Sequence, residues 1–306
     1  MTRILLTGRT GQVGCELRRA LAPLGQVIAT GRETLDLADP DSIRAAIREV
    51  QPEVIVNAAG YTTVDQAEAE PDLAMQVNGV ASGILAEEAR TRNALLVHYS
   101  TAYVFDGTSD RPYVEDDPPN PVNVYGRTKL AGERAIAAAG CDHLILRTSW
   151  IYSNRGINFL TTILKLAREG RELAVVDDQV GSPTWARALA EATAQALACR
   201  LTRDARAGVY HLTAAGEVSR YRLTLKILEH ARARSTGGDS WPGVRPIGSA
   251  GYPLPAARPP YSVLATDRIR RDLGVAMEHW EQQLERCFAE AGDETHRAQP
   301  SSRNAS

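Results

Sequence analysis

The feature that most constrains the fold of this 306-residue chain is the regular alternation of short apolar runs with longer helical patterns in its first half. Runs rich in Val, Ile and Leu predict strands at residues 3–7, 27–30, 54–57, 95–100 and 143–147. Longer segments between them predict helices at residues 13–24, 40–50, 71–92 and 125–139. Such alternation is typical of right-handed βαβ units, and apolar strand interiors indicate a sheet covered on both faces. The sequence therefore predicts an α/β fold with a doubly wound, parallel Rossmann sheet.

The regular pattern ends after Trp150. Helical patterns recur at residues 159–168, 184–198 and 221–233, but segments rich in Gly and Pro separate them. We therefore expect a smaller, interlocked α/β lobe beside the Rossmann domain. The expected boundaries are 1–150 for the Rossmann domain, with a return at about 171–200, and 151–170 with 201–292 for the lobe. Residues 293–306 are polar and lack periodicity, which predicts a disordered tail.

Charge and composition exclude several classes of protein. The formal net charge of −2 argues against the strongly basic surface of a nucleic-acid-binding protein. No apolar run approaches the ~20 residues that span a bilayer, and no signal-peptide pattern precedes the first predicted strand. The 4 cysteines are far apart, as expected for reduced thiols. We therefore expect a cytoplasmic protein whose partners include neither nucleic acid nor membrane.

A glycine-rich turn follows the first predicted strand. Gly8, Gly11 and Gly14 are spaced as Gly-x-x-Gly-x-x-Gly and lie where that strand passes into a helix. Glycines at such a turn let the backbone approach a pyrophosphate, which binds against the N-terminus of the helix. The run Asn-Ala-Ala-Gly that starts at Asn57 offers small side chains after the third predicted strand, where a ribose or adenine would pass. Together these segments predict a dinucleotide site in the Rossmann domain.

The end of the second predicted strand indicates which dinucleotide binds. An acidic residue about 20 residues after the glycine turn usually binds the adenine-ribose hydroxyls. Here that strand ends Thr-Gly-Arg32, and an arginine can pair with the 2′-phosphate of NADPH. We therefore expect NADPH as the cofactor, with NADH as an accepted substitute. Two alternatives stay open: Arg32 is a solvated surface residue, or the adjacent Glu33 competes for the position.

Tyr125 and Lys129 carry the clearest chemical signal. Residues i and i+4 share one face of a helix, so the phenol and the ammonium should point into one space. A phenol is a poor acid at neutral pH, and a neighbouring positive charge lowers its pKa and assists proton transfer. Downstream of a dinucleotide turn, this pair predicts a carbonyl reductase. His98, inside a predicted buried strand, is interpreted as a core residue.

Several runs along the chain together carry a family resemblance: Asn57–Asp65, Ser100–Gly107, Tyr125–Glu133, Arg147–Trp150, Asp178–Thr184, Gly208–Leu212 and Ala257–Pro260. In these runs the chain resembles the extended short-chain dehydrogenases, and most of all the dTDP-4-dehydrorhamnose reductases, over about residues 1–290. The resemblance implies NADPH-dependent reduction of the 4-keto group of dTDP-4-dehydro-6-deoxy-L-mannose to dTDP-L-rhamnose. It also implies that the smaller lobe binds the dTDP-sugar.

The resemblance assigns roles to individual residues. Tyr125 would donate a proton to the keto oxygen, Lys129 would hold the nicotinamide ribose and lower the tyrosine pKa, and Thr101 would orient the carbonyl. The motifs and the resemblance together place cofactor contacts on Gly8, Thr10, Gly11, Gln12, Val13, Arg32, Asp36, Leu37, Ala58, Ala59, Gly60, Tyr61, Thr62, Tyr125 and Lys129. Substrate contacts fall on Thr101, Ala102, Tyr125, Trp150 and Arg258. Trp150 would pack on the sugar, or serve as a core tryptophan, and Arg258 would bind the diphosphate.

Two departures from the family pattern bear on these expectations. The family commonly has an aspartate after the catalytic threonine, whereas this chain has Ala102, which leaves the hydroxyl pattern of the substrate open. Some members bind magnesium between subunits through three glutamates. Glu16 and Glu290 match two of those positions, but Arg187 takes the third. A cation there repels a metal and can pair with the carboxylates, so we expect no metal and a monomer or weak homodimer.

Two alternatives to this activity remain. One is a reductase of a related dTDP-4-keto-6-deoxy sugar with a different configuration at C4, which Ala102 keeps open. The other is a noncatalytic regulatory subunit on the same scaffold. The intact Thr101, Tyr125 and Lys129 argue against it, because a binding module needs no matched proton donor and cation.

Overall fold

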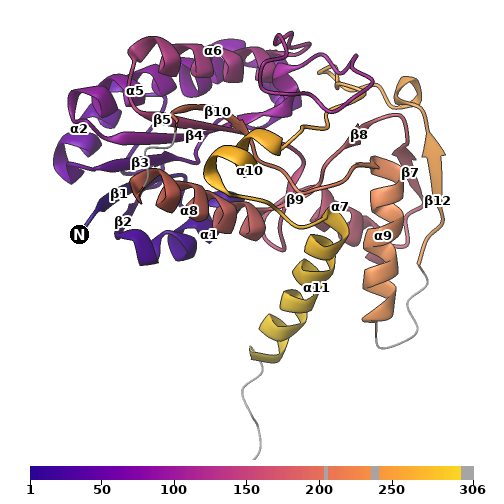
Figure 1. The fold of residues 1–306 in the computed structure, drawn as a ribbon. Coiled ribbons are helices and arrows are strands. Elements are labelled where there is room, and N and C mark those ends of the chain that lie inside the picture. The colour runs from indigo at the N-terminus through magenta and orange to yellow at the C-terminus, as the bar shows by residue number, and fades with distance from the viewer. Residues whose placement is uncertain (203–205, 236–240, 298–306) are drawn as a thin grey trace, which may run out of the picture.

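A computed structural model describes residues 1–202, 206–235 and 241–297 of the chain (Figure 1). Its central sheet consists of β1 (Arg3–Thr7), β2 (Gln26–Ala29), β3 (Val54–Asn57), β4 (Leu95–Thr101), β5 (His143–Thr148) and β10 (Gly208–His211). All six strands are parallel, in the order β10-β5-β4-β3-β1-β2. The strand order therefore reverses beside β1, and ligands of such sheets bind beyond the carboxyl ends of the strands at this point. The predicted doubly wound parallel sheet is confirmed.

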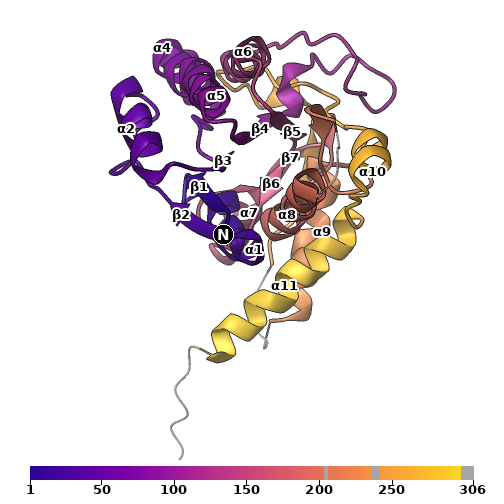
Figure 2. The same cartoon turned by 60° about the vertical axis from the view of Figure 1, so that its left-hand side comes forward.

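Helices cover both faces of this sheet (Figures 1 and 2). One face carries α1 (Gln12–Ala20) and α8 (Ala186–Thr202). The other carries α2 (Pro40–Val50), α5 (Ala81–Thr91) and α6 (Val124–Ala139). The structure thus has the three-layer arrangement that buries a parallel sheet on both sides.

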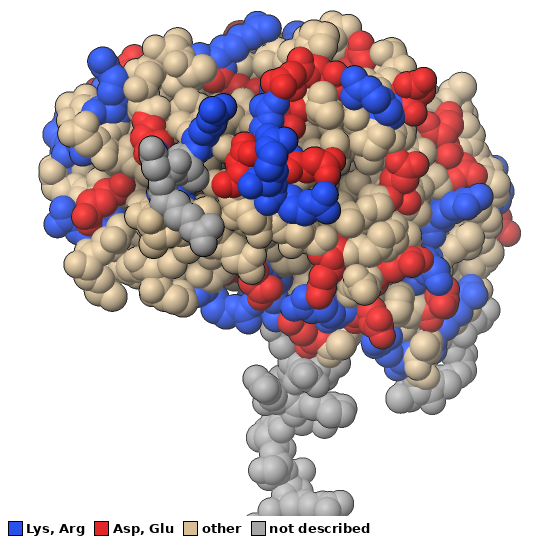
Figure 3. Space-filling model, viewed as in Figure 1, with Lys and Arg blue, Asp and Glu red and all other residues tan. Residues whose placement is uncertain are grey.

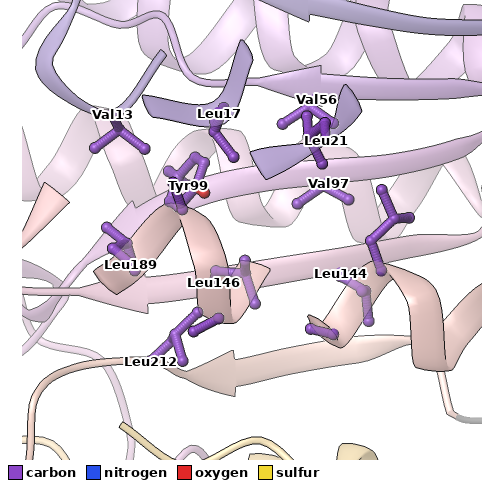
Figure 4. Close-up of a cluster of buried hydrophobic side chains, with 14 of the residues drawn as sticks. Val13, Leu17, Leu21, Val56, Val97, Tyr99, Leu144, Leu146, Leu189 and Leu212 are labelled. Atoms are coloured by element: carbon purple, nitrogen blue, oxygen red, sulfur yellow. The ribbon is translucent and has the colours of Figure 1, made fainter. Parts of the chain in front are cut away.

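The strands β1, β3, β4, β5 and β10 divide their apolar side chains between two cores, because successive side chains point to opposite faces. In β1, Ile4 and Leu6 belong to the core under α1 and α8, whereas Leu5 belongs to the core under α2 and α5. Figure 4 shows the first core, in which Leu17 of α1 and Leu189 of α8 lie among side chains of the strands. These five side chains are fully buried. Burial on both faces explains why the strands appear in the sequence as continuous apolar runs.

The helix predicted over residues 71–92 is divided in the structure. After a short helix, α3 (Val64–Ala69), α4 (Pro71–Met75) passes through a π-helical turn, η2 (Gln76–Val80), into α5. The π turn holds the buried side chain of Asn78, whose amide bonds the backbone N–H and C=O of Tyr61 at 2.9 and 3.0 Å. Single π turns inside helices are frequent at functional sites. Here the turn fixes the loop that follows β3.

A second lobe combines short strand pairs with helices (right side of Figure 1). The pairs are β6 (Ile151–Tyr152) with β9 (Thr184–Trp185), β7 (Leu173–Val176) with β12 (Val244–Ile247), and β8 (Val180–Gly181) with β11 (Val218–Ser219). The helices are α7 (Phe159–Arg168), α9 (Arg220–Ala233) and α11 (Trp280–Arg297). Trp185, Trp280 and Phe288 lie in the core of this lobe, which is separate from the two cores of the sheet.

The chain divides between the two parts differently from the predicted boundaries. β7 and β8 fall within the expected return to the Rossmann domain, but they pair with strands of the second lobe. Conversely, β10 and α10 (Asp267–Leu273) fall within the expected lobe, but they join the central sheet and its core. These elements are too short to show a clear period, so only tertiary packing determines their place.

The C-terminal segment also differs from the prediction. The sequence predicts a disordered tail from residue 293, but α11 continues through Arg297. Charged residues such as Glu and Arg are good helix formers, so a lack of apolar periodicity does not prevent a helix. The rest of the predicted tail, residues 298–306, lies outside the described residues.

The surface carries charges of both signs. On the face shown in Figure 3, basic and acidic side chains are interspersed over the sheet domain and the second lobe. Within the described part of the chain, no helix combines the length and the apolar character needed to cross a bilayer. The face in Figure 3 therefore shows no broad region of a single charge.

Candidate active site

A cavity of about 750 Å³ runs along the carboxyl ends of the central strands to the junction with the second lobe. Its walls come from the loops after β1 to β4, from the start of α6, and from α7 and α9. Most predicted site residues line it: Gly8, Thr10, Gly11, Gln12, Val13, Arg32, Asp36, Leu37, Ala58, Ala59, Gly60, Thr62, Thr101, Tyr125, Lys129 and Trp150. Tyr61, Ala102 and Arg258 are predicted site residues that do not line it.

The glycine turn forms a close cradle at one end of the cavity. Gly8 adopts a left-handed conformation, with a φ of 75°. A Cβ atom at Gly14 would lie 2.0 Å from the carbonyl oxygen of Gly8, so only glycine lets α1 start this near the turn. Gly11 caps α1 without a side-chain hydrogen bond, which leaves the first N–H groups of the helix available. These features fit a dinucleotide pyrophosphate at a helix N-terminus.

The surroundings of Arg32 bear on the choice between NADPH and NADH. Arg32 is exposed and lines the cavity after β2. The neighbouring Glu33, which could compete with it, forms an ion pair with Arg9 of the glycine turn at 2.6 Å. The carboxylate is therefore partly neutralised, and Arg32 is left facing the cavity. A positive rim of this kind suits a 2′-phosphate.

The loop after β3 reaches the cavity through its backbone and small side chains. Ala58, Ala59 and Gly60 line the cavity, as predicted from the small residues at this strand end. Tyr61 behaves differently, because its phenol donates a hydrogen bond to Glu70 at 2.7 Å. Its side chain is held away from the cavity, and Asn78 fixes its backbone. A cofactor contact through the side chain of Tyr61 is therefore not seen in the structure.

Tight packing at the start of α6 brings the predicted catalytic residues together. The side chain of Asn123 caps the helix by accepting a hydrogen bond from the N–H of Gly126 at 2.7 Å. This cap places Tyr125 in the first turn and Lys129 one turn later, both at the cavity. A Cβ at Gly126 would lie 2.1 Å from the carbonyl oxygen of Tyr103, so glycine is required for this approach. As a result Thr101, at the end of β4, lies beside the phenol of Tyr125.

Burial, rather than Lys129, has the largest effect on the acidity of Tyr125. It raises the pKa of Tyr125 to about 12, whereas the hydrogen bond from Thr101 lowers it and Tyr103 raises it further. The prediction that Lys129 lowers this pKa is not borne out, because the ammonium makes its contact elsewhere. A tyrosine with this pKa stays protonated at neutral pH, which is the state that a proton donor needs.

Lys129 ends a chain of buried polar side chains. Its Nζ lies 3.2 Å from Nε2 of His98, and Nδ1 of His98 lies 3.1 Å from Nδ2 of Asn57. The oxygen of Asn57 accepts a hydrogen bond from Thr7 at 2.7 Å. Burial lowers the pKa of Lys129 to about 8, while the charge of Glu133 raises it. Burial and Lys129 both lower the pKa of His98, which is therefore neutral. His98 is buried as predicted, and it also positions the lysine.

A buried ion pair supports these residues from behind. Glu133, one turn after Lys129 on α6, accepts hydrogen bonds from Nε and Nη2 of Arg147 at 2.9 and 2.6 Å. Ser100 donates a further hydrogen bond to the same carboxylate. The side chains of Arg147 and Glu133 are only 4% and 5% exposed. The pair ties β4, β5 and α6 together, so it fixes the strand end that bears Thr101 against the helix that bears Lys129.

The second lobe supplies aromatic and cationic side chains to the other end of the cavity. Trp150 has a φ of 45°, a left-handed conformation that is rare outside glycine and concentrated at functional sites. The guanidinium carbon of Arg220 lies 3.6 Å from the centroid of a Trp150 ring. Trp150 lines the cavity, as predicted for a substrate contact, but Arg220 already covers one face of its indole.

Two predicted substrate contacts lie away from the cavity. Ala102 is fully buried and packs with Val104 and Phe105, because the chain turns into η3 (Ala102–Val104) immediately after Thr101. Arg258 donates a hydrogen bond to Asp65 at 2.8 Å and another to a backbone carbonyl at 2.9 Å. That ion pair joins residues 193 positions apart, which no local sequence pattern reveals.

The position expected to exclude a metal holds a cluster of ion pairs. Arg187 donates to Glu16 at 2.9 Å and also to Glu290. The predicted pairing of this arginine with both carboxylates is therefore present within one chain. Among the described residues, no group of three or more His, Cys, Asp or Glu side chains is placed to hold a metal ion. Independence from metal stays a prediction that needs an experiment.

Sequence reasoning missed several residues of the cavity. Tyr103, Phe159 and Arg220 line it, and none was selected from the sequence. Tyr103 follows Thr101 by two positions, so it could have been found as part of the same loop. Arg220 and Phe159 come from the second lobe, where no motif marked them. Only the folding of that lobe against the sheet brings them to the site.

Comparisons with known proteins agree with this geometry. The family model described as RmlD substrate binding domain matches residues 1–292. The chain is 44% identical to a dTDP-4-dehydrorhamnose reductase of Burkholderia thailandensis over 290 residues, which are 93% of this chain and 97% of that protein. It is 41% identical to the dTDP-4-dehydrorhamnose reductase of Escherichia coli K12, covering 94% and 97% of the two chains. The structure is similar to that of a Bacillus anthracis dTDP-4-dehydrorhamnose reductase in complex with NADP, with a TM-score of 0.87, 33% identity, and 94% and 99% coverage.

Proposed function

The chain belongs to the RmlD family of dTDP-4-dehydrorhamnose reductases, and on this premise we propose that it reduces the 4-keto group of dTDP-4-dehydro-6-deoxy-L-mannose to give dTDP-L-rhamnose. The protein is an NAD(P)H-dependent oxidoreductase, as its sequence resemblance to the family implied. The observation that carries the proposal is the meeting of Thr101, Tyr125 and Lys129 in one cavity with the glycine cradle.

Tyr125 is the proton donor of the proposed reaction. The glycine cradle at Gly8, Gly11 and Gly14 would hold NADPH, and the chemistry that this cofactor would supply is a hydride for C4 of the sugar. The phenol of Tyr125 gives its proton to the keto oxygen, which becomes the hydroxyl of the product. The hydroxyl of Thr101 lies beside the phenol and would orient the carbonyl. It also stabilises the phenolate that remains after the proton has left.

Lys129 supplies a fixed positive charge one helical turn from Tyr125. The ammonium has further N–H donors for the ribose of the nicotinamide. The contact with His98 holds the lysine side chain at the cavity wall. His98 is thus a positioning residue, which acts on the reaction through Lys129.

Arg32 supports NADPH as the preferred cofactor. It faces the cavity after β2, while Arg9 neutralises the competing carboxylate of Glu33. The NADP in the Bacillus anthracis structure supports the same choice. We further propose that the enzyme works in the cytoplasm as a monomer or weak homodimer. Arg187 supports this assembly state, because it neutralises Glu16 and Glu290 within one chain, without a metal ion shared between subunits.

A related dTDP-4-keto-6-deoxy sugar with another configuration at C4 is the second candidate substrate. Ala102 leaves it open, since this chain has a buried alanine, which lies away from the cavity, where the family commonly has aspartate. The catalytic groups would be the same for either sugar. Only the face of C4 that receives the hydride would differ.

Replacement of Tyr125 tests the proposed mechanism. Tyr125→Phe keeps the ring but removes the proton, so kcat should fall by about 10²–10⁴-fold, the usual scale for a lost general acid. The affinity for NADPH should stay unchanged. Tyr252→Phe is the matched control, because Tyr252 is 55% exposed and does not line the cavity. Turnover of the Tyr125→Phe variant at the wild-type rate would show that Tyr125 is not the proton donor.

A further inference from the structure

Arg220 is a cation of the cavity wall that no carboxylate neutralises within the described residues. It is the first residue of α9 and faces the end of the cavity formed by the second lobe. Its guanidinium carbon lies 3.6 Å from the ring centroid of Trp150 and 4.8 Å from that of Phe159. Tyr103 also lies beside its side chain, whose pKa burial lowers and Tyr103 raises. The side chain is therefore held by aromatic groups rather than by an anion.

Three other buried or half-buried arginines, which lie outside the cavity, are each paired with a carboxylate. Arg147 pairs with Glu133, Arg187 with Glu16, and Arg258 with Asp65. Arg220 differs, because burial and the nearby charge of Arg258 both lower its pKa. Cation–π contacts stabilise a cation through the ring quadrupole but do not neutralise its charge. The protein thus retains at this wall a positive charge that its own groups only partly stabilise.

The stacked geometry leaves hydrogen-bond donors available. A guanidinium group stacks through its flat face, whereas its five N–H bonds point outward in the plane of the group. Contact of the flat face with Trp150 and Phe159 therefore uses none of these donors. A planar fork with free N–H bonds matches two phosphate oxygens at once. The rings fix the orientation of the fork, so little side-chain freedom is lost on binding.

We propose that Arg220 binds the diphosphate of the nucleotide-sugar substrate, with Trp150 and Phe159 as the platform that holds it. This inference rests on the proposed function, since that function supplies a substrate with two adjacent phosphates. Arg220 takes the role that the sequence predicted for Arg258, because Arg258 already forms an ion pair with Asp65. Arg32 lies at the other end of the cavity, on the loop after β2, where the cofactor phosphate is expected.

Calorimetric titration with dTDP and with thymidine tests this role. Saturating NADP⁺ is included so that the nucleotides do not enter the cofactor site. Arg220→Gln should weaken binding of dTDP by about 10- to 100-fold, the scale of hydrogen bonds to a charged group, and leave thymidine binding unchanged. Arg220→Lys keeps the charge and should restore part of the lost affinity. Arg222→Gln, an exposed arginine two positions further along α9, should bind dTDP like the wild type.

The outcomes separate this inference from the proposed function. Wild-type affinity for dTDP in Arg220→Gln would overturn the role of Arg220 and leave the proposed function intact. An equal loss of dTDP and thymidine binding would also overturn it, since that pattern reports a collapse of the Trp150 platform. A wild-type protein that binds neither dTDP nor thymidine would instead contradict the proposed substrate. Should Arg220→Gln not fold, the wild-type affinity for dTDP must still fall with rising salt while thymidine binding does not.

Discussion

Burial of the charged Lys129 side chain should destabilise the folded protein by an amount that depends on pH. The side chain is only 6% exposed, and burial lowers its pKa from 10.5 to about 8. The unfolded chain therefore binds this proton more tightly than the folded chain does. Below pH 8 the charged Lys129 lowers the free energy of unfolding by its full amount. This destabilisation decreases as the pH rises and is lost above pH 10.5.

The size of this effect follows from the two pKa values. Their difference of about 2.5 corresponds to roughly 3 kcal/mol at pH 7, and to about 1 kcal/mol at pH 9.5. Lys129→Met removes the charge but leaves Nε2 of His98 without a partner, which costs about 1 kcal/mol at either pH. We therefore expect the variant to be about 2 kcal/mol more stable than the wild type at pH 7. At pH 9.5 the two proteins should be nearly equal in stability.

Urea denaturation of both proteins at pH 7 and pH 9.5 measures this difference. Lys165→Met is the matched control, because Lys165 is 75% exposed and should show no such dependence on pH. The decisive quantity is the narrowing of about 2 kcal/mol between the two pH values, since the lost contact with His98 cancels from it. The charged Lys129 does not destabilise the fold if the variant is less stable than the wild type at pH 7. The same holds if the difference in stability between the two proteins does not decrease from pH 7 to pH 9.5.

Two further predictions concern the cofactor and the ion-pair cluster. Arg32→Ala should weaken NADPH binding by about 1.5–3 kcal/mol, the scale of a charge-assisted hydrogen bond, and leave NADH binding almost unchanged. Equal losses for both cofactors, measured by fluorescence titration, would show that Arg32 does not contact the 2′-phosphate. The activity and sedimentation of the wild type should not respond to EDTA or magnesium, because Arg187 takes the place of a cation between Glu16 and Glu290. Arg187→Glu brings three carboxylates together and should make stability depend on magnesium, and a magnesium-dependent mass of the wild type would contradict this account.

Much of the Rossmann domain could be predicted from the sequence, because its strands and helices alternate in long, regular segments. The helices at Pro40–Val50 and Phe159–Arg168 and the strand at Val54–Asn57 have the predicted bounds. The pairing of Tyr125 with Lys129 could also be predicted, since one helical turn separates them and a capping residue fixes the start of the helix. Local rules suffice wherever the structure depends on neighbours in the sequence.

The remaining features depend on contacts between distant segments. β10 is a run of four residues whose place in the sheet is decided by its pairing with β5. Arg258 was expected to bind the diphosphate, but its neutralisation by Asp65 becomes visible only in the folded chain. Arg220 carries no motif, and it reaches Trp150 only because α9 packs against the junction of the two parts. Burial likewise decides the pKa of Tyr125, which helical spacing alone predicted in the wrong direction.

We expect this protein to transfer a hydride from NADPH to C4 of a dTDP-4-keto sugar while Tyr125 supplies the proton. The most direct measurement uses dTDP-4-dehydro-6-deoxy-L-mannose with NADPH that carries deuterium at the transferred position, followed by NMR of the product. We expect dTDP-L-rhamnose with a single deuterium on C4 of the sugar. A product with the opposite configuration at C4 would support the related sugar reductase instead, and the absence of deuterium from C4 would contradict the account.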